Sequence, residues 1–234
     1  MTDVLRALVG DAPTVVDLGS GPGSLASRIL DQLPDAHVVA VDADPLLLEL
    51  GSQTLGTRGG HVRWVDCDLR DPKIADRLEL NQPADAALST TALHWLSREE
   101  LVGLFGRLAQ ILRPGGVFIN GDHLSFDQDQ GRIASAVKRL RDERAAVPRV
   151  SGVDTWTEWW AAIEADPTLA GLVAERRSRW GGHHDHHAPG EATFMSSALE
   201  QSGFAEVGTV WQELDNRVLV AIMGSGTANG SATG

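Results

Sequence analysis

The sequence contains no tyrosine and one cysteine, and it has far fewer basic than acidic residues. The single cysteine, Cys67, excludes an internal disulfide and a zinc site built from cysteines. The excess of acids gives a formal net charge of −12. This charge argues against nucleic acid as a partner, because phosphate binding favours a basic patch. The most basic stretch, residues 138–144, is interrupted by acids, and we interpret it as an exposed helix face.

Long apolar runs are also absent from the sequence. None reaches the ~18 residues that a membrane-spanning helix requires. The first residues, Met1-Thr2-Asp3, lack the basic and apolar regions of a secretion signal. We therefore expect a cytoplasmic protein with no membrane partner. A length of 234 residues suits one α/β domain with an insertion.

Short apolar runs alternate with helical patterns along the first 120 residues. The runs are mostly continuous, as strands buried on both faces should be. This order predicts a parallel sheet covered by helices on both faces. Ser97, followed three residues later by Glu100, marks a helix start. The predicted strands are 14–18, 37–41, 61–65, 84–89 and 117–120, and the predicted helices are 24–32, 45–55, 74–80 and 97–112.

The pattern changes after residue 120, where helical spacing without strands continues to about residue 190. We interpret this stretch as a helical substrate lid inserted above the carboxyl edge of the sheet. A helix and a hairpin then complete the core. The elements predicted here are helices at 133–146, 156–164, 169–180 and 193–202, and strands at 206–214 and 217–223. The resulting divisions are a core at 1–120, the lid at 121–190, the rest of the core at 191–223 and a disordered tail at 224–234.

The chain is organised around the stretch Val15-Val16-Asp17-Leu18-Gly19-Ser20-Gly21-Pro22-Gly23. An apolar strand ends in an acid and a glycine-rich turn, and a helix follows. This arrangement presents backbone N–H groups and a helix N-terminus to a ligand. The spacing is G-x-G-x-G, whereas dinucleotide sites use G-x-G-x-x-G, and this chain has Ser24 at the later position. Taken alone, the turn can also be a plain strand–helix connection.

Acidic residues end the two strands that follow the glycine-rich turn. Asp42 can accept hydrogen bonds from both ribose hydroxyls of an adenosine, or else cap the helix that follows it. Asp68 can accept from an exocyclic amine of a base; alternatively it is a turn residue, with Asp66 as a rival for the same role. Asp17, in front of the turn, can lie near the rest of the ligand, or else accept a hydrogen bond from the backbone of the turn. An acid at this place favours a cationic sulfonium over a pyrophosphate. The constellation therefore favours S-adenosylmethionine over NAD.

Five short motifs occur in a fixed order: Val16-Asp17-Leu18-Gly19-Ser20-Gly21-Pro22-Gly23, Val39-Ala40-Val41-Asp42-Ala43-Asp44, Asp68-Leu69, Ala84-Asp85-Ala86-Ala87-Leu88-Ser89 and Leu112-Arg113-Pro114-Gly115-Gly116. Together they resemble class I S-adenosylmethionine-dependent methyltransferases. The resemblance implies an α/β, doubly wound Rossmann-like sheet of seven strands, mostly parallel with the last strand antiparallel. It also implies S-adenosylmethionine as the cofactor, bound by the core at 1–120. The cofactor-binding residues that it implies are Asp17, Gly19, Ser20, Gly21 and Gly23 near the methionine part, Asp42 and Ala43 at the ribose, Asp68 and Leu69 at the adenine, and Ser89 and Thr90 at the sulfonium.

The stretch Ala92-Leu93-His94-Trp95-Leu96 resembles the trans-aconitate methyltransferase-like group of that family. In such enzymes this stretch faces the transferred methyl group, so His94 and Trp95 are the first candidates for substrate contact. His94 can act as a general base, donate a hydrogen bond to the substrate or hold a loop in place. His123, just past the fifth strand, is the second catalytic candidate. The stretch lacks the Asn-Pro-Pro-Tyr signature expected of amide- or adenine-N-methylating relatives.

The predicted lid is rich in tryptophan and histidine. Many relatives have a longer N-terminal helical cap than this chain, so we expect the lid to supply most of the substrate cover. Trp156, Trp160 and Trp180 can line an apolar or cationic acceptor, or simply form the core of the lid. The run at 183–187, His-His-Asp-His-His, contains metal-ligating residue types. One loop seldom forms a complete metal site alone, so we predict no metal there. The remaining interpretations are a loop that faces the substrate and a loop exposed to solvent.

The leading hypothesis is a methyltransferase that acts on oxygen, nitrogen or carbon of a small-molecule acceptor, in specialised metabolism or on an acid of the aconitate type. The acidic composition does not favour an anionic acceptor. A Rossmann oxidoreductase that binds NAD(P) and a non-catalytic protein that binds S-adenosylmethionine are the alternatives. We expect a monomer or a homodimer that does not bind nucleic acid.

Overall fold

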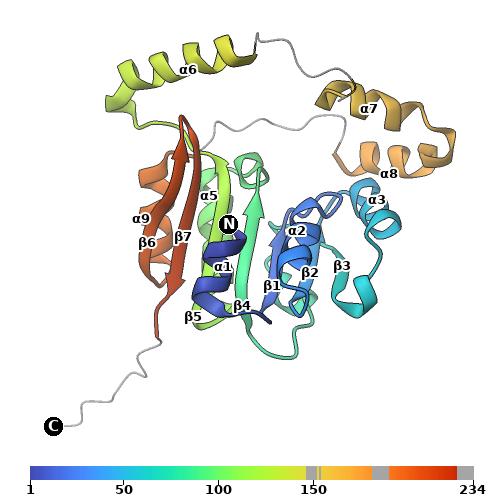
Figure 1. Ribbon diagram of the computed structural model, residues 1–234, viewed down its shortest axis with the longest axis horizontal. Helices are drawn as coiled ribbons and strands as arrows, with labels where there is room; N and C mark the ends of the chain where they lie inside the picture. Colours follow the sequence, from blue (N-terminus) through green and yellow to red (C-terminus); the bar gives the residue numbers. More distant parts are fainter. Residues whose placement is uncertain (146–151, 153, 181–189, 226–234) are drawn as a thin grey trace.

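The structure is a computed structural model that describes residues 1–145, 152, 154–180 and 190–225 (Figure 1). Its core is a seven-stranded sheet in the order β3-β2-β1-β4-β5-β7-β6. Strand β7 pairs antiparallel with both neighbours, and the other pairs are parallel. The predicted doubly wound sheet with an antiparallel last strand is therefore confirmed. The strands are β1 (Thr14–Leu18), β2 (His37–Asp42), β3 (Val62–Asp66), β4 (Ala84–Thr90), β5 (Leu112–His123), β6 (Phe204–Glu213) and β7 (Asn216–Met223).

Helices cover both faces of this sheet. The α-helices are α1 (Thr2–Val9), α2 (Ser24–Gln32), α3 (Pro45–Thr54), α4 (Ile74–Arg77), α5 (Arg98–Ile111), α6 (Gly131–Ala145), α7 (Trp156–Ala165), α8 (Ala170–Trp180) and α9 (Ala192–Gln201). The short 3-10 helices are η1 (Arg58–Gly60), η2 (Leu93–Trp95), η3 (Gln128–Gln130) and η4 (Pro167–Leu169). None of the helices in the described ranges is long and apolar enough to cross a bilayer.

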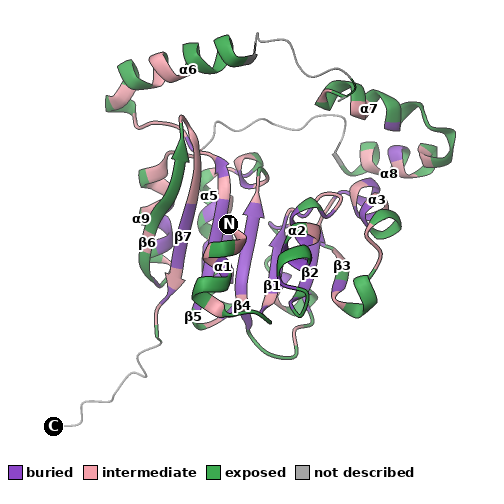
Figure 2. Ribbon diagram, viewed as in Figure 1, coloured by how far each residue is buried: buried purple, intermediate pink, exposed green. Residues whose placement is uncertain are grey.

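Strand β1 shows how the sheet separates two apolar cores. Val16 and Leu18 pack in a cluster with residues of α4, α5 and α9, whereas Val15 packs in a second cluster with residues of α1 and α2. The alternation follows from the two-residue repeat of a strand. Buried residues accordingly fill the central strands in Figure 2. The core therefore fixes the carboxyl ends of β1, β2 and β4, where the predicted site lies.

Local sequence signals explain most of the element boundaries. Ser97 and Glu100 form the predicted capping box, since each side chain accepts a hydrogen bond from the other residue's backbone N–H. The glycine-rich stretch 114–116 does not delay the fifth strand as expected, because β5 already begins at Leu112. Instead the pairing register jumps within this stretch, with Gly115 at a φ of 70°.

The segment predicted as a lid lies beyond the carboxyl edge of the sheet, where Figure 1 shows α6, α7 and α8. Helix α6 is largely exposed (Figure 2). Helices α7 and α8 instead pack on α3 through a small apolar cluster around Leu46, Ile163 and Val173. The insertion is thus anchored above the second and third strands. Most of the predicted disordered tail, residues 226–234, lies outside the described residues.

Candidate active site: a glycine-rich turn and a histidine–aspartate pair

The glycine-rich turn between β1 and α2 is held by hydrogen bonds to the end of β2. The N–H groups of Gly19 and Ser20 both donate to the carbonyl of Val41, at 2.9 Å each. The N–H of Gly21 donates to Oδ2 of Asp42 at 2.7 Å. The turn and Asp42 therefore form one unit, at the edge of the sheet where the sequence predicted both of them.

Glycine is required at two positions of this turn for steric reasons. Gly19 and Gly23 have φ angles of 69° and 83°, a region that L-residues rarely adopt. A Cβ atom on Gly19 would lie 2.4 Å from Cβ of Ala92, and one on Gly23 would lie 2.5 Å from the Trp64 ring. The turn is thus pressed between Trp64 and the connection that follows β4.

Asp42 uses its carboxylate to organise the turn. Its second oxygen, Oδ1, accepts from the N–H of Asp44 at 2.8 Å. Burial raises the pKa of Asp42, and these backbone donors oppose that shift. Asp44 caps α3 by accepting from the N–H of Leu46 at 3.0 Å, so the alternative in which Asp42 is the helix cap is wrong. Ala43, between the two acids, is half-buried beside the pocket described below.

Asp17 at the end of β1 is a buried acid with an incomplete hydrogen-bond set. Its exposed fraction is 1% and its Oδ2 atom has no hydrogen-bond partner within the described ranges. Burial, together with the charge of Asp42, raises the pKa of Asp17 to about 7. Two acids therefore lie close together behind the turn, and a positively charged ligand would relieve their repulsion.

An open pocket of about 440 Å³ lies at the carboxyl ends of β2 and β3. Asp68 lines it and forms an ion pair with Arg70, 2.6 Å from Nη2 to Oδ2. Burial would raise the pKa of Asp68, but its hydrogen bonds to Arg70 outweigh that effect and lower it. Leu69 is buried next to the glycine-rich turn, since its Cδ1 lies 4.0 Å from where a Cβ on Gly19 would be. The structure thus places Leu69 next to the turn and Asp68 in the wall of the pocket, where it is paired with Arg70.

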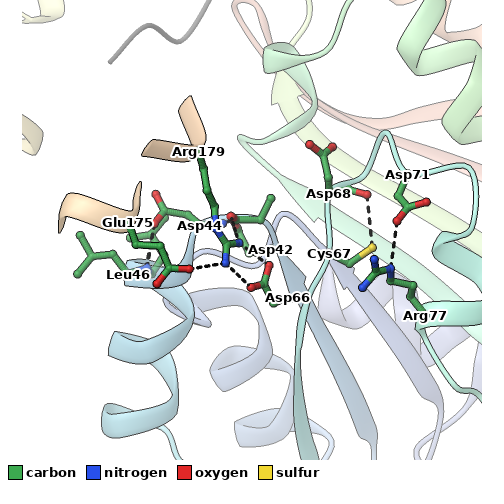
Figure 3. Close-up of polar contacts among 12 residues, drawn as sticks. Asp42, Asp44, Leu46, Asp66, Cys67, Asp68, Asp71, Arg77, Glu175 and Arg179 are labelled. Carbon is green, nitrogen blue, oxygen red and sulfur yellow. Dashed lines mark hydrogen bonds and ion pairs between the residues drawn. The ribbon is translucent and has the colours of Figure 1, made fainter. Parts of the chain in front are cut away.

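Helix α8 contributes one wall of this pocket, which sequence analysis missed. Arg179 binds both oxygens of Asp66 at 2.7 and 2.8 Å and donates to the carbonyl of Ala43 at 3.1 Å (Figure 3). One turn earlier, Arg176 donates to Oδ2 of Asp44 at 2.5 Å. The only signal in the sequence was the spacing of two arginines on one helix face. Asp66, the predicted rival of Asp68, is therefore occupied by an arginine from the lid.

A histidine–aspartate pair lies at the ends of β4 and β5. Nδ1 of His94 is 2.8 Å from Oδ1 of Asp122, and the backbone N–H of His94 donates to Oδ2 at 3.2 Å. The N–H of His123 also donates to Oδ1, at 2.8 Å. Asp122 is 1% exposed at its side chain, whereas His94 is 23% exposed. Sequence analysis did not identify Asp122, although it directly precedes a predicted site residue.

Unsatisfied polar atoms surround this pair. Both side-chain polar atoms of Asn120 are buried without a hydrogen-bond partner in the described ranges, and so is Nδ1 of His123. A cavity of about 10 Å³, close to the size of one water molecule, is lined by Asn120, Asp122, His94 and His123 among others. Buried polar groups without partners are uncommon in folded proteins. This part of the site is therefore incomplete without a further hydrogen-bonding group.

The remaining predicted site residues are placed less uniformly. Ser89 is fully buried and its hydroxyl donates to the carbonyl of Leu18 at 2.9 Å, so its side chain joins β4 to β1. Its contact with the sulfonium stays a prediction. The half-buried Thr90 ends β4 beside Gly121 of β5. The ring centroids of Trp95 and His94 are 5.1 Å apart.

The lid tryptophans divide into packed and exposed rings. Trp160 lies under the guanidinium of Arg176, 4.2 Å from its centre, within the apolar cluster on α3. Trp156 is 67% exposed. Trp180 ends α8, but its side chain and the histidine-rich run at 183–187 lie outside the described residues. Packing of α7 and α8 on α3 therefore accounts for Trp160 without a substrate.

Comparison with known proteins identifies the fold and the domain. A family model described as a methyltransferase domain matches residues 15–116. A trans-aconitate 2-methyltransferase of Azoarcus sp. is 31% identical over 61% of this chain and 54% of that protein. A second, from Streptomyces coelicolor, is 28% identical over 81% of this chain and 61% of that protein. The chain thus spans little more than half the length of the relatives it matches.

Solved structures share the whole architecture at low identity. An O-methyltransferase family protein from Burkholderia thailandensis superposes with a TM-score of 0.63 at 19% identity, covering 97% of this chain and 56% of that one. Human N-acetylserotonin methyltransferase, solved with S-adenosylmethionine, gives 0.56 at 16% identity, over 94% of this chain and 51% of that one. Likeness at this level shows the fold. Residues 15–116 match a methyltransferase domain, and the sequence relatives named above are themselves methyltransferases.

Proposed function

We propose that this chain transfers a methyl group from S-adenosylmethionine to a small-molecule acceptor. The observation that carries the proposal is the pair of acids at the glycine-rich turn. Asp42 accepts a hydrogen bond from the turn, and the nearby Asp17 is buried with one carboxylate oxygen that has no hydrogen-bond partner in the described residues. A pyrophosphate would be repelled by these two acids. A sulfonium or ammonium group would supply the positive charge that they lack.

The residues around the turn suit the three parts of the cofactor. The turn from Gly19 to Gly23 suits the methionine part, because Gly19, Gly21 and Gly23 have no side chains that would keep a ligand from its backbone. Asp42 keeps acceptor capacity for ribose hydroxyls, because a carboxylate offers about four lone-pair sites and the two N–H donors use only part of them. Asp68 and Ala43 line the pocket that suits an adenine, and Leu69 follows Asp68 in the chain.

When bound, S-adenosylmethionine supplies an electrophilic methyl group. The chain's contribution is to hold an acceptor atom in line with that group and to exclude water. His94 and Trp95 lie on η2, directly after the segment that presses on Gly19. We assign the acceptor to this side of the site, under the segment 121–190 acting as a lid.

The test is calorimetry of the folded protein with S-adenosylmethionine and S-adenosylhomocysteine. We expect saturable binding of both, and Asp42→Ala should weaken it by about 1–3 kcal/mol through lost charged hydrogen bonds. Asp31→Ala is the matched control, because Asp31 forms an exposed surface pair with Arg58. No binding of either ligand by folded wild-type protein would refute the proposal.

Two further measurements separate the alternatives. NAD and NADP should produce no heat, and binding of either would favour an oxidoreductase. Transfer of a labelled methyl group to any small acceptor would exclude a protein that binds the cofactor without turnover. The cofactor and the acceptor are the partners that this proposal requires, and the net charge of −12 does not favour a nucleic-acid acceptor.

A further inference from the structure

We propose that His94, held by Asp122, accepts the proton of the methyl acceptor, and that this pair selects an acceptor with a hydroxyl group. The inference rests on the proposed methyl transfer and names the substrate class for that same site. None of the sequence motifs identified Asp122. Its role here is to position the histidine.

The hydrogen bonds of Asp122 fix the state of the imidazole. A carboxylate accepts but does not donate, so the contact of 2.8 Å from Oδ1 to Nδ1 requires the proton on Nδ1. Nε2 is then left with a free lone pair. The two backbone donors from His94 and His123 hold the carboxylate itself in place. The imidazole is therefore oriented as a base before any acceptor arrives.

The location of the pair links it to the cofactor side. Ala92 lies against the position that a Cβ of Gly19 would occupy, and His94 is only two residues further along η2. The His94 side chain remains 23% exposed although Asp122 is almost fully buried. The base thus lies on the segment that directly follows the contact with the glycine-rich turn, and part of its side chain is exposed.

The chemistry of methyl transfer explains why a base implies a hydroxyl. As the acceptor oxygen forms its bond to the methyl carbon, the carbon–sulfur bond breaks and its electron pair remains on sulfur. A hydroxyl that kept its proton would become a high-energy oxonium, so the proton must pass to Nε2 of His94 during the transfer. The products are a methyl ether, a neutral thioether and an imidazolium paired with Asp122.

Carboxylates and amines do not need this help. A carboxylate such as trans-aconitate is already ionised at neutral pH and has no proton to lose. A neutral amine attacks with its lone pair and gives a stable ammonium that loses its proton afterwards. A buried aspartate that orients a histidine therefore favours a hydroxyl acceptor and argues against the acid acceptor named for two of the matched relatives.

The first test measures the tautomer without any acceptor. In the complex of the full chain with S-adenosylhomocysteine, nitrogen-15 NMR of labelled histidines should show His94 protonated at Nδ1 and not at Nε2 above neutral pH. His94→Gln assigns the signal, and Asp122→Asn should shift the population toward the Nε2-protonated form. A predominantly Nε2-protonated His94 in the wild-type complex would overturn the proposal, while failure to bind S-adenosylhomocysteine would instead count against the proposed function.

The second test compares acceptors that carry different functional groups on the same benzene ring. Phenol, aniline and benzoate are offered with labelled S-adenosylmethionine, together with 4-nitrophenol, which is largely a phenolate at pH 8. Transfer to phenol should fall about 10²–10⁴-fold in His94→Gln, with a loss of the same direction in Asp122→Asn, whereas transfer to 4-nitrophenol should fall far less.

A control variant sharpens the comparison, because replacing an unrelated histidine should leave transfer to phenol unchanged. His61→Gln is the control, because that imidazole bonds the carbonyl of Ala36 at the opposite edge of the sheet. Efficient transfer to benzoate that is unchanged in His94→Gln would overturn the proposal.

Discussion

The two halves of the carboxyl edge are built in different ways. In the cofactor half, at the ends of β1, β2 and β3, backbone N–H groups hold the acids, as in the contacts of Gly21 and Asp44 with Asp42. In the acceptor half, where β4 and β5 end and β7 begins, a contact between the side chains of His94 and Asp122 is added to the backbone donors. Polar atoms of Asn120 and Asp215 there remain without hydrogen-bond partners in the described part of the chain. The first half is a preformed cradle, and the second leaves hydrogen-bonding capacity for a variable ligand.

This difference has a physical origin in the two kinds of contact. A backbone cradle depends on turn conformation and on a few obligatory residues, so it can serve one invariant ligand. Side-chain networks can be changed one residue at a time, which suits a site whose substrate differs between relatives. We therefore expect substitutions that add bulk to impair mainly the cofactor half. Substitutions that replace a polar side chain should impair mainly the acceptor half.

The largest effect is expected from Gly19→Ala. The new methyl group would meet Ala92 at 2.4 Å in a backbone conformation with a φ of 69°. Overpacking and left-handed strain together should cost about 2–5 kcal/mol of unfolding free energy and abolish measurable cofactor binding. Denaturant unfolding and calorimetry provide the two readouts.

Two variants make this test specific. Adding Ala92→Gly removes the collision and should restore part of the stability, leaving the strain of about 1–2 kcal/mol. Gly106→Ala, in the middle of α5 with no atom near its Cβ position, should be neutral or stabilising by about 0.5–1 kcal/mol. Equal losses for Gly19→Ala and Gly106→Ala would show that the turn is not under steric constraint.

A smaller but pH-dependent effect is expected from Asp17→Asn. The pKa of Asp17 is about 7 in the fold against 3.8 for the unperturbed group, so the folded state binds the extra proton. Its contribution to stability is therefore present at low pH and is lost as pH rises from about 4 to 7, by up to about 4 kcal/mol. Asp17→Asn should raise the thermal midpoint at pH 8 and have less effect at pH 5.

The same change should impair function. A neutral amide cannot pair with a cationic ligand, so Asp17→Asn should bind S-adenosylmethionine more weakly at pH 8 while being more stable. Asp11→Asn, a surface residue paired with Arg6, serves as the control for both readouts. A variant that is destabilised at pH 8, or that binds the cofactor unchanged, would contradict the assignment of Asp17 as an unpaired buried acid.

The sequence was informative where function depends on local backbone geometry. The glycine spacing and the acids at successive strand ends predicted that the turn and Asp42 lie at one edge of the sheet, because parallel strands bring their carboxyl ends together. It could not predict that His94 pairs with Asp122, since this contact depends on the register of β4 against β5 and on how η2 folds back. Nor could it predict that the side chain of Ser89, at a strand end, is fully buried.

The lid provides the last and smallest test. Arg179 bridges α8 to Asp66 and Ala43, both of which line the pocket next to the turn, whereas Arg177 pairs with Glu164 inside the α7–α8 hairpin. These pairs are partly exposed, so each is worth only about 0.5–1 kcal/mol and is weakened by salt. Arg179→Ala should therefore speed the dissociation of S-adenosylhomocysteine about two- to fivefold in stopped-flow measurements at low salt, with a smaller ratio at high salt. Arg177→Ala should leave the rate unchanged. If both variants accelerate release equally, the effect comes from general loosening of the hairpin, and contact with Ala43 and Asp66 does not hold the lid over the pocket.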